Sequence, residues 1–184
     1  MLWDDFINSY WRNWRTSDRS GDRDRLEDPE WIEAWLRRHR LEAPLPPNER
    51  ELRKLQELRS RLFDTVRQLA GGHPLDPSVT ADLNAYMAKG AVTRTLEPSE
   101  DGTLLLVLQP AEQSWTQVMA EIVASFAEAL LKEPSRFRVC DNPDCLWVYY
   151  DDTRNRSKRY CDDKACGNLM KVRRHRARKK AERE

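Results

Sequence analysis

The stretch that decides the fold of the C-terminal part reads C-DNPD-C-LWVYYDDTRNRSKRY-C-DDKA-C, from Cys140 to Cys166. It holds all four cysteines of the 184-residue chain as two C-x4-C pairs, Cys140 with Cys145 and Cys161 with Cys166, and 15 residues separate the pairs. Two short loops that each bring a pair of thiolates supply the four soft ligands of tetrahedral zinc. The spacing therefore predicts one structural Zn²⁺ per chain, bound by these four side chains.

Two disulfides or four unrelated core thiols are the alternatives for these cysteines. Because the first 139 residues contain no cysteine and the four cluster, a metal site in a reducing compartment explains the pattern better. A catalytic zinc does not fit, since four thiolates leave no open position for water or substrate. Metal binding worth ~10 to 16 kcal/mol would supply the folding energy that this segment, poor in apolar residues, lacks.

The residues between the two pairs favour a hairpin. Residues 147–150 are strong strand formers, residues 151–155 form a polar turn, and residues 156–160 can return antiparallel. That return would place Cys161 beside Cys145.

Asp162 and Asp163 are good caps for a final helix that runs to about Arg178. Cys166 would lie in its first turn, where unpaired backbone amides and the helix dipole favour a thiolate. A knuckle, a hairpin and a helix that donates the second pair resemble a treble-clef zinc module.

Charge is distributed unevenly along the chain, although the formal net charge is only +1. Residues 154–184 contain 13 Lys and Arg against four Asp and Glu, a net charge of +9, and the first 153 residues carry −8. Such asymmetry predicts that the C-terminal end binds a polyanion and that the acidic body does not contact phosphates.

The basic residues expected to contact nucleic acid lie on the hairpin and on the final helix: Arg154, Arg156, Lys158, Arg159, Lys171, Arg173, Arg174, Arg176, Arg178 and Lys179. The helical ones cannot all share one face, so some should reach phosphates while one or two face base edges. For about half of these side chains, a solvated surface charge is the simpler interpretation.

Two alternatives to DNA binding use the same segment. RNA could bind the basic surface and stack on an exposed Tyr149 or Tyr150, and a zinc module can also serve as a protein-docking platform. The charge of +9 favours nucleic acid over docking. An enzyme is disfavoured, because the three histidines are scattered and no nucleophile motif or phosphate-binding glycine loop occurs.

The N-terminal part reads as a mainly helical domain with one β-hairpin. Aromatic residues recur at helical spacing over residues 2–14, Asp28 and Pro29 open a second helix, and leucines recur over residues 49–70. A helix from Pro77 to about Lys89, a hairpin over residues 91–109 and a helix after Pro110 follow, with the last at the centre of the core. The chain is thus predicted to be α+β, with a domain of residues 1–134 and a zinc module of residues 135–184.

The C-terminal run resembles the CGNR zinc finger of bacterial and archaeal regulators. The two cysteine pairs, the aromatic Trp147, the polar Asp152, Asn155 and Arg159, Gly167 with Asn168, and the basic helix carry the resemblance. Two positions depart from the family: Leu169 stands in place of the name-giving Arg, which removes one candidate phosphate or base contact, and Tyr160 stands where Trp is commoner.

The N-terminal part resembles the ABATE domain that precedes this finger. Residues 5–9, DFINS, are similar to its opening D-F-V-N-T motif, and residues 33–36, EAWL, are similar to its next helix. The resemblance implies a stress-responsive transcription regulator whose N-terminal domain senses a small-molecule effector. Asp5 and Asn8 could line that pocket, although both also suit polar caps of the first helix.

The sequence also predicts where the protein acts. The longest apolar run, residues 104–108, is far shorter than the ~20 residues of a membrane span, and the N-terminus lacks a signal-peptide pattern. We therefore expect a cytoplasmic, nucleoid-associated protein with no membrane partner. A homodimer is compatible with the sequence but cannot be derived from it.

Overall fold

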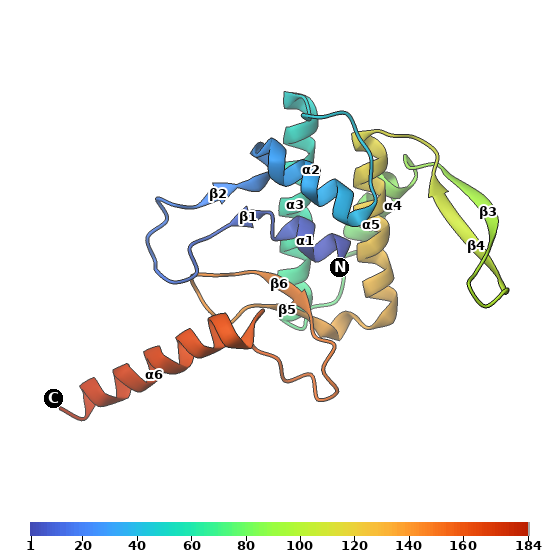
Figure 1. Ribbon diagram of the computed structural model, residues 1–184. Helices are drawn as coiled ribbons and strands as arrows, with labels where there is room; N and C mark the ends of the chain where they lie inside the picture. Colours follow the sequence, from blue (N-terminus) through green and yellow to red (C-terminus); the bar gives the residue numbers. More distant parts are fainter. Residues whose placement is uncertain (184) are drawn as a thin grey trace.

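A computed structural model describes residues 1–183 and shows a helical N-terminal body, beneath which the cysteine-rich segment lies and from which the last helix projects (Figure 1). In chain order the elements are α1 (Leu2–Ile7), β1 (Tyr10–Trp11), β2 (Arg23–Asp24), the 3-10 turn η1 (Arg25–Glu27), α2 (Pro29–His39), α3 (Glu49–Ala70), α4 (Pro77–Met87), β3 (Val92–Pro98), β4 (Leu104–Pro110), α5 (Trp115–Lys132), the 3-10 turn η2 (Pro134–Arg136), β5 (Phe137–Val139), β6 (Val148–Tyr150), the π-helical turn η3 (Asp163–Gly167) and α6 (Asn168–Ala181). The predicted fold class is confirmed: a mostly helical part with small hairpins is followed by a four-cysteine cluster with short strands and a terminal helix.

Helices α2 and α3 begin where the sequence predicts. Asp28 accepts hydrogen bonds from the amides of Glu30 and Trp31, with Pro29 in the first turn of α2. Asn48 forms a reciprocal capping box with Glu51 at the start of α3. These caps satisfy the backbone donors that each helix start leaves unpaired.

The core of the body forms where α1, α3 and α5 meet. Trp3 and Phe126 contact edge-to-face with ring centroids 5.6 Å apart, and both are fully buried. The apolar face of α5 is buried along nearly its whole length, which confirms its predicted central position. Within residues 1–183, no helix is long and apolar enough to cross a membrane.

The first helix is shorter than predicted: α1 ends at Ile7 and does not continue to Trp14. The Asn8 carboxamide bonds the backbone N–H and C=O of Val148, both at 2.9 Å, which fixes the chain on β6. Residues 10–11 then pair with residues 23–24 as a two-stranded ribbon. Trp14 is half-buried against the cysteine cluster and is not part of the main core.

The strand partner of β6 also differs from the prediction. Residues 148–150 pair antiparallel with residues 137–139 and not with residues 156–160. The reason is that Phe137 is fully buried beside Trp3 and Phe126, with ring centroids 5.0 and 5.2 Å away. Burial of this side chain holds β5 against the body, so β5 is the strand available to β6. The division at residues 134 and 135 stays a prediction.

The hairpin of β3 and β4 forms as predicted and projects away from the helical body (Figure 1). Its pairs run from Val92 opposite Pro110 to Pro98 opposite Leu104. Nearly every residue of the two strands is exposed.

Candidate metal centre and basic helix

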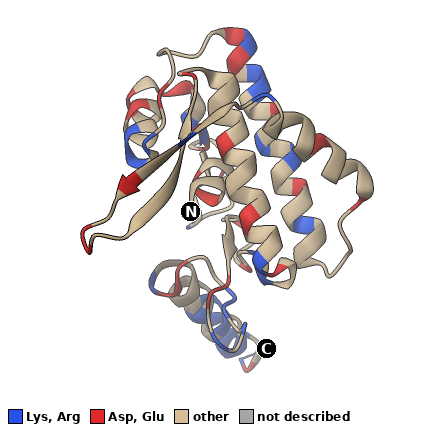
Figure 2. Ribbon diagram, turned by 90° about the vertical axis from the view of Figure 1, so that its right-hand side faces the viewer, with Lys and Arg blue, Asp and Glu red and all other residues tan. Residues whose placement is uncertain are grey.

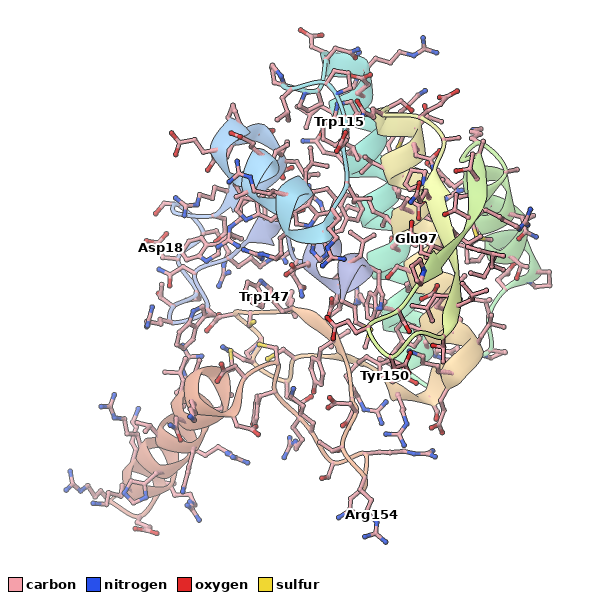
Figure 3. All side chains as sticks on the ribbon, turned by 45° about the vertical axis from the view of Figure 1, so that its right-hand side comes forward. Asp18, Glu97, Trp115, Trp147, Tyr150 and Arg154 are labelled. Atoms are coloured by element: carbon pink, nitrogen blue, oxygen red, sulfur yellow. The ribbon has the colours of Figure 1, made fainter. Side chains whose placement is uncertain are left out.

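The four cysteine sulfur atoms converge on one point between Trp147 and the start of α6 (Figure 3). All four lie within 4.8 Å of one another, with Cys145 Sγ 3.7 Å from Cys161 Sγ and Cys161 Sγ 3.9 Å from Cys166 Sγ. A tetrahedral zinc with Zn–S bonds of ~2.3 Å requires sulfur separations of about 3.8 Å. A disulfide needs about 2.05 Å, so the disulfide alternative is excluded and the sulfurs form a zinc-binding site.

Two backbone features bring the first cysteine pair together. The amide of Cys140 donates to the carbonyl of Trp147 at 2.8 Å, and the amide of Cys145 donates to the carbonyl of Asn142 at 2.9 Å. Leu146, directly after the second cysteine, has a φ of 59°, the left-handed conformation that turns the chain away from the site. Cys161 therefore lies beside Cys145 as predicted, although the strand pairing that was expected to place it there is absent from the described residues.

The electrostatics of the cluster suit a cation. Hydrogen bonds from the thiols of Cys145 and Cys161 lower the pKa of Cys140. The same contacts with Cys140 raise the pKa values of Cys145 and Cys161, and burial raises that of Cys166. Four thiolates this close together, three of them buried, cannot coexist without a compensating charge, which a divalent ion at the centre of the sulfurs supplies.

Asn142, inside the first C-x4-C loop, joins the metal centre to the body. It is fully buried, and its amide nitrogen lies 2.9 Å from the carbonyl oxygen of Trp14 and 3.4 Å from Cys166 Sγ. A donor directed at a ligand sulfur stabilises the thiolate form. Asn142 was not among the site residues predicted from the sequence.

Asp144, two residues further on, connects three segments. Its carboxylate lies 3.1 Å from a guanidinium nitrogen of Arg19, in the β1–β2 loop, and 2.6 Å from one of Arg173, on α6. Arg173 also donates to the carbonyl of Arg15 at 2.9 Å. The start of α6 is therefore fixed to both the zinc loop and the N-terminal body.

The loop between β6 and Cys161 is shaped by Asp151, which is fully buried. Its carboxylate accepts from the amide and hydroxyl of Thr153, at 3.0 and 2.5 Å, and from the amide of Lys158 at 3.1 Å. Burial alone would raise the pKa of Asp151, but these hydrogen bonds outweigh it and lower the pKa. The loop therefore presents Arg154 at a defined place, pointing away from the body (Figure 3).

The ten predicted nucleic-acid contacts fall into two groups. Three are ion-paired within the protein: Arg156 with Glu133, Arg159 with Asp141, and Arg173 with Asp144. Lys158 is half-buried, with its ammonium nitrogen 5.0 Å from the centre of the Tyr149 ring. These four side chains have structural partners.

The other six have exposed side chains, namely Arg154, Lys171, Arg174, Arg176, Arg178 and Lys179. Within residues 1–183, none of the six has a carboxylate oxygen within 4 Å. Five lie on α6, which Figure 2 shows below the helical body with its Lys and Arg residues in blue. None of the residues of α6 is buried, so most of its surface is available to a partner.

The tyrosines considered for RNA stacking are both partly or fully covered. Tyr149 is buried in the cysteine module, and its hydroxyl donates to the carbonyl of Lys158 at 2.8 Å. Tyr150 is half-buried against Phe137, with ring centroids 5.6 Å apart. Tyr149 therefore presents no free face of the kind that base stacking uses, and Tyr150 is only partly accessible.

The candidate effector residues have partners inside the protein. One carboxylate oxygen of Asp5 lies 2.9 Å from His39 Nε2 and 3.2 Å from a guanidinium nitrogen of Arg38. The carboxamide of Asn8 is occupied by Val148. Their role in ligand binding stays a prediction.

The fold and the sulfur geometry together define a zinc-finger protein with a helical N-terminal domain. The ABATE family, described as "Putative stress-induced transcription regulator", matches residues 2–134, and the CGNR zinc finger matches residues 136–179. The chain belongs to the ABATE family and carries a C-terminal CGNR zinc finger, which confirms both resemblances. This is a family of transcription regulators and not of enzymes. No curated protein matches the chain.

Proposed function

We propose that the protein regulates transcription by binding DNA through its zinc module. One observation carries the proposal: five exposed cationic side chains, without a carboxylate partner among residues 1–183, lie on α6, which projects from the acidic body. A helix of 14 residues is about 21 Å long and fits the major groove, which is roughly 12 Å wide. Phosphate contacts from such side chains supply most of the affinity of a DNA-binding protein.

The two groups of basic residues have different roles: one stabilises the module, and the other contacts DNA. Arg156, Arg159 and Arg173 fix the loop and the start of α6 through their ion pairs. The six exposed side chains are left to contact phosphates or base edges, with Arg154 on the loop gripping the backbone beside the helix. This division supports a preformed binding surface, which loses little conformational entropy on binding DNA.

The N-terminal body is proposed to sense a stress-related small molecule and not to contact DNA. Its net charge of −8 over residues 1–153 would repel phosphates. Binding of DNA would place the protein at the chromosome in the cytoplasm. Asp144 contacts both Arg19 of the body and Arg173 of α6, so a movement of the body on effector binding would also move α6.

Fluorescence anisotropy of the zinc-loaded full chain tests this proposal. The probes are a labelled random 20-base-pair DNA duplex, an RNA duplex of the same length and a single-stranded RNA. We expect the DNA duplex to bind most tightly, with nonspecific Kd values in the range of about 10⁻⁴ to 10⁻⁶ M at physiological salt. Tighter binding of either RNA would favour the RNA alternative. If no nucleic acid binds even at low salt, the module is a protein-docking platform and the proposal is wrong.

A further inference from the structure

The β3–β4 hairpin has one strongly apolar face. Residues that stand opposite each other in an antiparallel pair point to the same side, so the pairs Leu96 with Leu106, Pro98 with Leu104 and Arg94 with Leu108 share a face, on which Arg94 is the one charged residue. We call Leu96, Leu104, Leu106 and Leu108 the leucine face. The opposite face carries Thr93, Thr95, Glu97, Leu105, Val107 and Gln109.

The leucine face is uncovered in the single chain. Its four side chains are 57 to 68% exposed, whereas Val107 on the other face is half-buried. An antiparallel hairpin normally packs its more apolar face against a core. In this chain the hairpin instead projects from the body, and Gly90, just before β3, lies close to Ala120 of α5 (Figure 1).

From these observations we infer that the leucine face is a dimer interface, covered by the leucine face of a second copy of this chain. The apolar area that it exposes is on the order of 500 Å², which lies at the upper end of the patches that monomers tolerate. Two such faces together would bury about 1,000 Å², which is the lower bound for a specific interface. A two-stranded hairpin is marginally stable alone, so pairing would also stabilise it.

The strand composition agrees with a second copy as the occupant. β3 carries Arg94, Glu97 and Pro98, which protect a strand edge, whereas β4 has five consecutive apolar residues from Leu104 to Leu108. An apolar surface of four leucines with Arg94 at one end fits a two-fold interface, in which each copy offers the same patch. The inference concerns assembly and does not depend on what α6 binds.

Analytical ultracentrifugation of the zinc-loaded full chain tests the inference. We expect a species of about twice the chain mass of 21.7 kDa at micromolar concentration. Leu106→Glu places a charge in the leucine face of both copies and should raise the dimer dissociation constant about 100-fold or more. Leu105→Glu is the matched control, since Leu105 is the adjacent residue, is 51% exposed and lies on the other face; it should leave the dimer intact.

A second control concerns Leu131 on α5, which is 87% exposed and lines an apolar groove between α4 and α5. Leu131→Glu should also leave the dimer intact. If Leu131→Glu dissociates the dimer and Leu106→Glu does not, the groove is the interface and the inference is wrong. A wild-type chain that stays monomeric at 100 μM, or equal dissociation by Leu105→Glu and Leu106→Glu, would overturn it as well.

Photo-cross-linking keeps the test decisive if Leu106→Glu perturbs the hairpin. A benzophenone amino acid at position 106 should link two chains through peptides that both contain residues 92–110, and the same probe at position 105 should not. Cross-links from position 106 to α4 or α5 of another chain would overturn the leucine-face assignment.

Discussion

The guanidinium of Arg173 lies 2.6 Å from the carboxylate of Asp144, so a residue of the basic helix is held by a residue of the first zinc loop. The sequence predicts Arg173 as a nucleic-acid contact, one of a run of cations on α6. Its side chain also donates to the carbonyl of Arg15 and is only one-third exposed, which makes it a positioning residue for the helix. The direction of α6 relative to the body therefore depends on this ion pair.

Arg173→Ala should destabilise the docking of α6 by about 1 to 3 kcal/mol, because the carboxylate of Asp144 loses the closer of its two guanidinium partners. Hydrogen exchange of the α6 amides measures the effect, and these amides should exchange faster than in wild type. Arg176→Ala is the control, since that side chain is exposed, and it should leave the exchange unchanged. Equal exchange in both variants would show that the ion pair does not hold the helix.

Local signals in the sequence predicted much of the fold, and contacts between distant segments account for what it missed. Asp28, Pro29 and Asn48 define helix starts through neighbouring residues, and the two C-x4-C pairs define the metal centre in the same way. Asn8 ends α1 by bonding Val148, 140 residues away, and no local pattern contains that information. The polar residues of the DNPD loop were the available signal for Asn142 and Asp144, but their partners lie in the β1–β2 loop and on α6.

One zinc ion per chain is expected in purified protein, as measured by elemental analysis. Cys166→Ser leaves three thiolates and should reduce the retained zinc, because the hydroxyl is a poor ligand for zinc. Ser135→Ala is a suitable control, because Ser135 is exposed and lies outside the metal centre. Full zinc retention by Cys166→Ser would show that a fourth sulfur is not required.

Phe137→Ala should destabilise the N-terminal body by about 3 to 5 kcal/mol, although residue 137 lies beyond the proposed domain boundary at 134. The ring is fully buried between Trp3 and Phe126, so its loss opens a cavity in the main core. Urea denaturation followed by tryptophan fluorescence measures the change. Phe137→Leu should cost less, because it keeps much of the apolar volume. A small effect of Phe137→Ala would mean that the body folds independently of β5.

The ion pair of Asp24 with Arg59 should make stability fall at acid pH. Burial acts to raise the pKa of Asp24, but the hydrogen bonds and charge of Arg59 outweigh it and lower the pKa below the ordinary value. A carboxyl with a lowered folded-state pKa stabilises the protein above its unfolded pKa of about 4 and loses that contribution as pH falls through the folded value.

Asp24→Asn tests this, since the amide oxygen can still accept from the amide of Leu26. We expect a loss of about 3 kcal/mol at pH 7, and this deficit should shrink below pH 4 as wild type loses the charge. Asp64→Asn, at an exposed position on α3, is the control. A deficit that is the same at pH 7 and pH 3 would exclude the ion pair as its cause.

The salt dependence of DNA binding should report the number of phosphate contacts. Six exposed cations give a slope of log K against log[salt] near −5, at roughly −0.9 per contact. Replacing Arg176, Arg178 and Lys179 together by Ala should flatten the slope by about 2 to 3 units and weaken binding to all sequences alike. An arginine that reads a base would behave differently, since its loss costs ~1 to 3 kcal/mol on the preferred site and much less on random DNA.

The matched control removes the same charge from the body: Arg50, Arg53 and Lys54 of α3 are exposed, and their replacement by Ala also lowers the net charge by three. If long-range attraction explained the slope, both triple variants would flatten it similarly. Direct contact by α6 predicts that only the Arg176, Arg178 and Lys179 variant changes the slope, because released counterions come from phosphates that a cation touches. Zinc content and circular dichroism must match wild type in both. An unchanged slope and affinity in the folded α6 variant would show that this helix is not the DNA-binding surface, and the docking alternative would then explain its charge better.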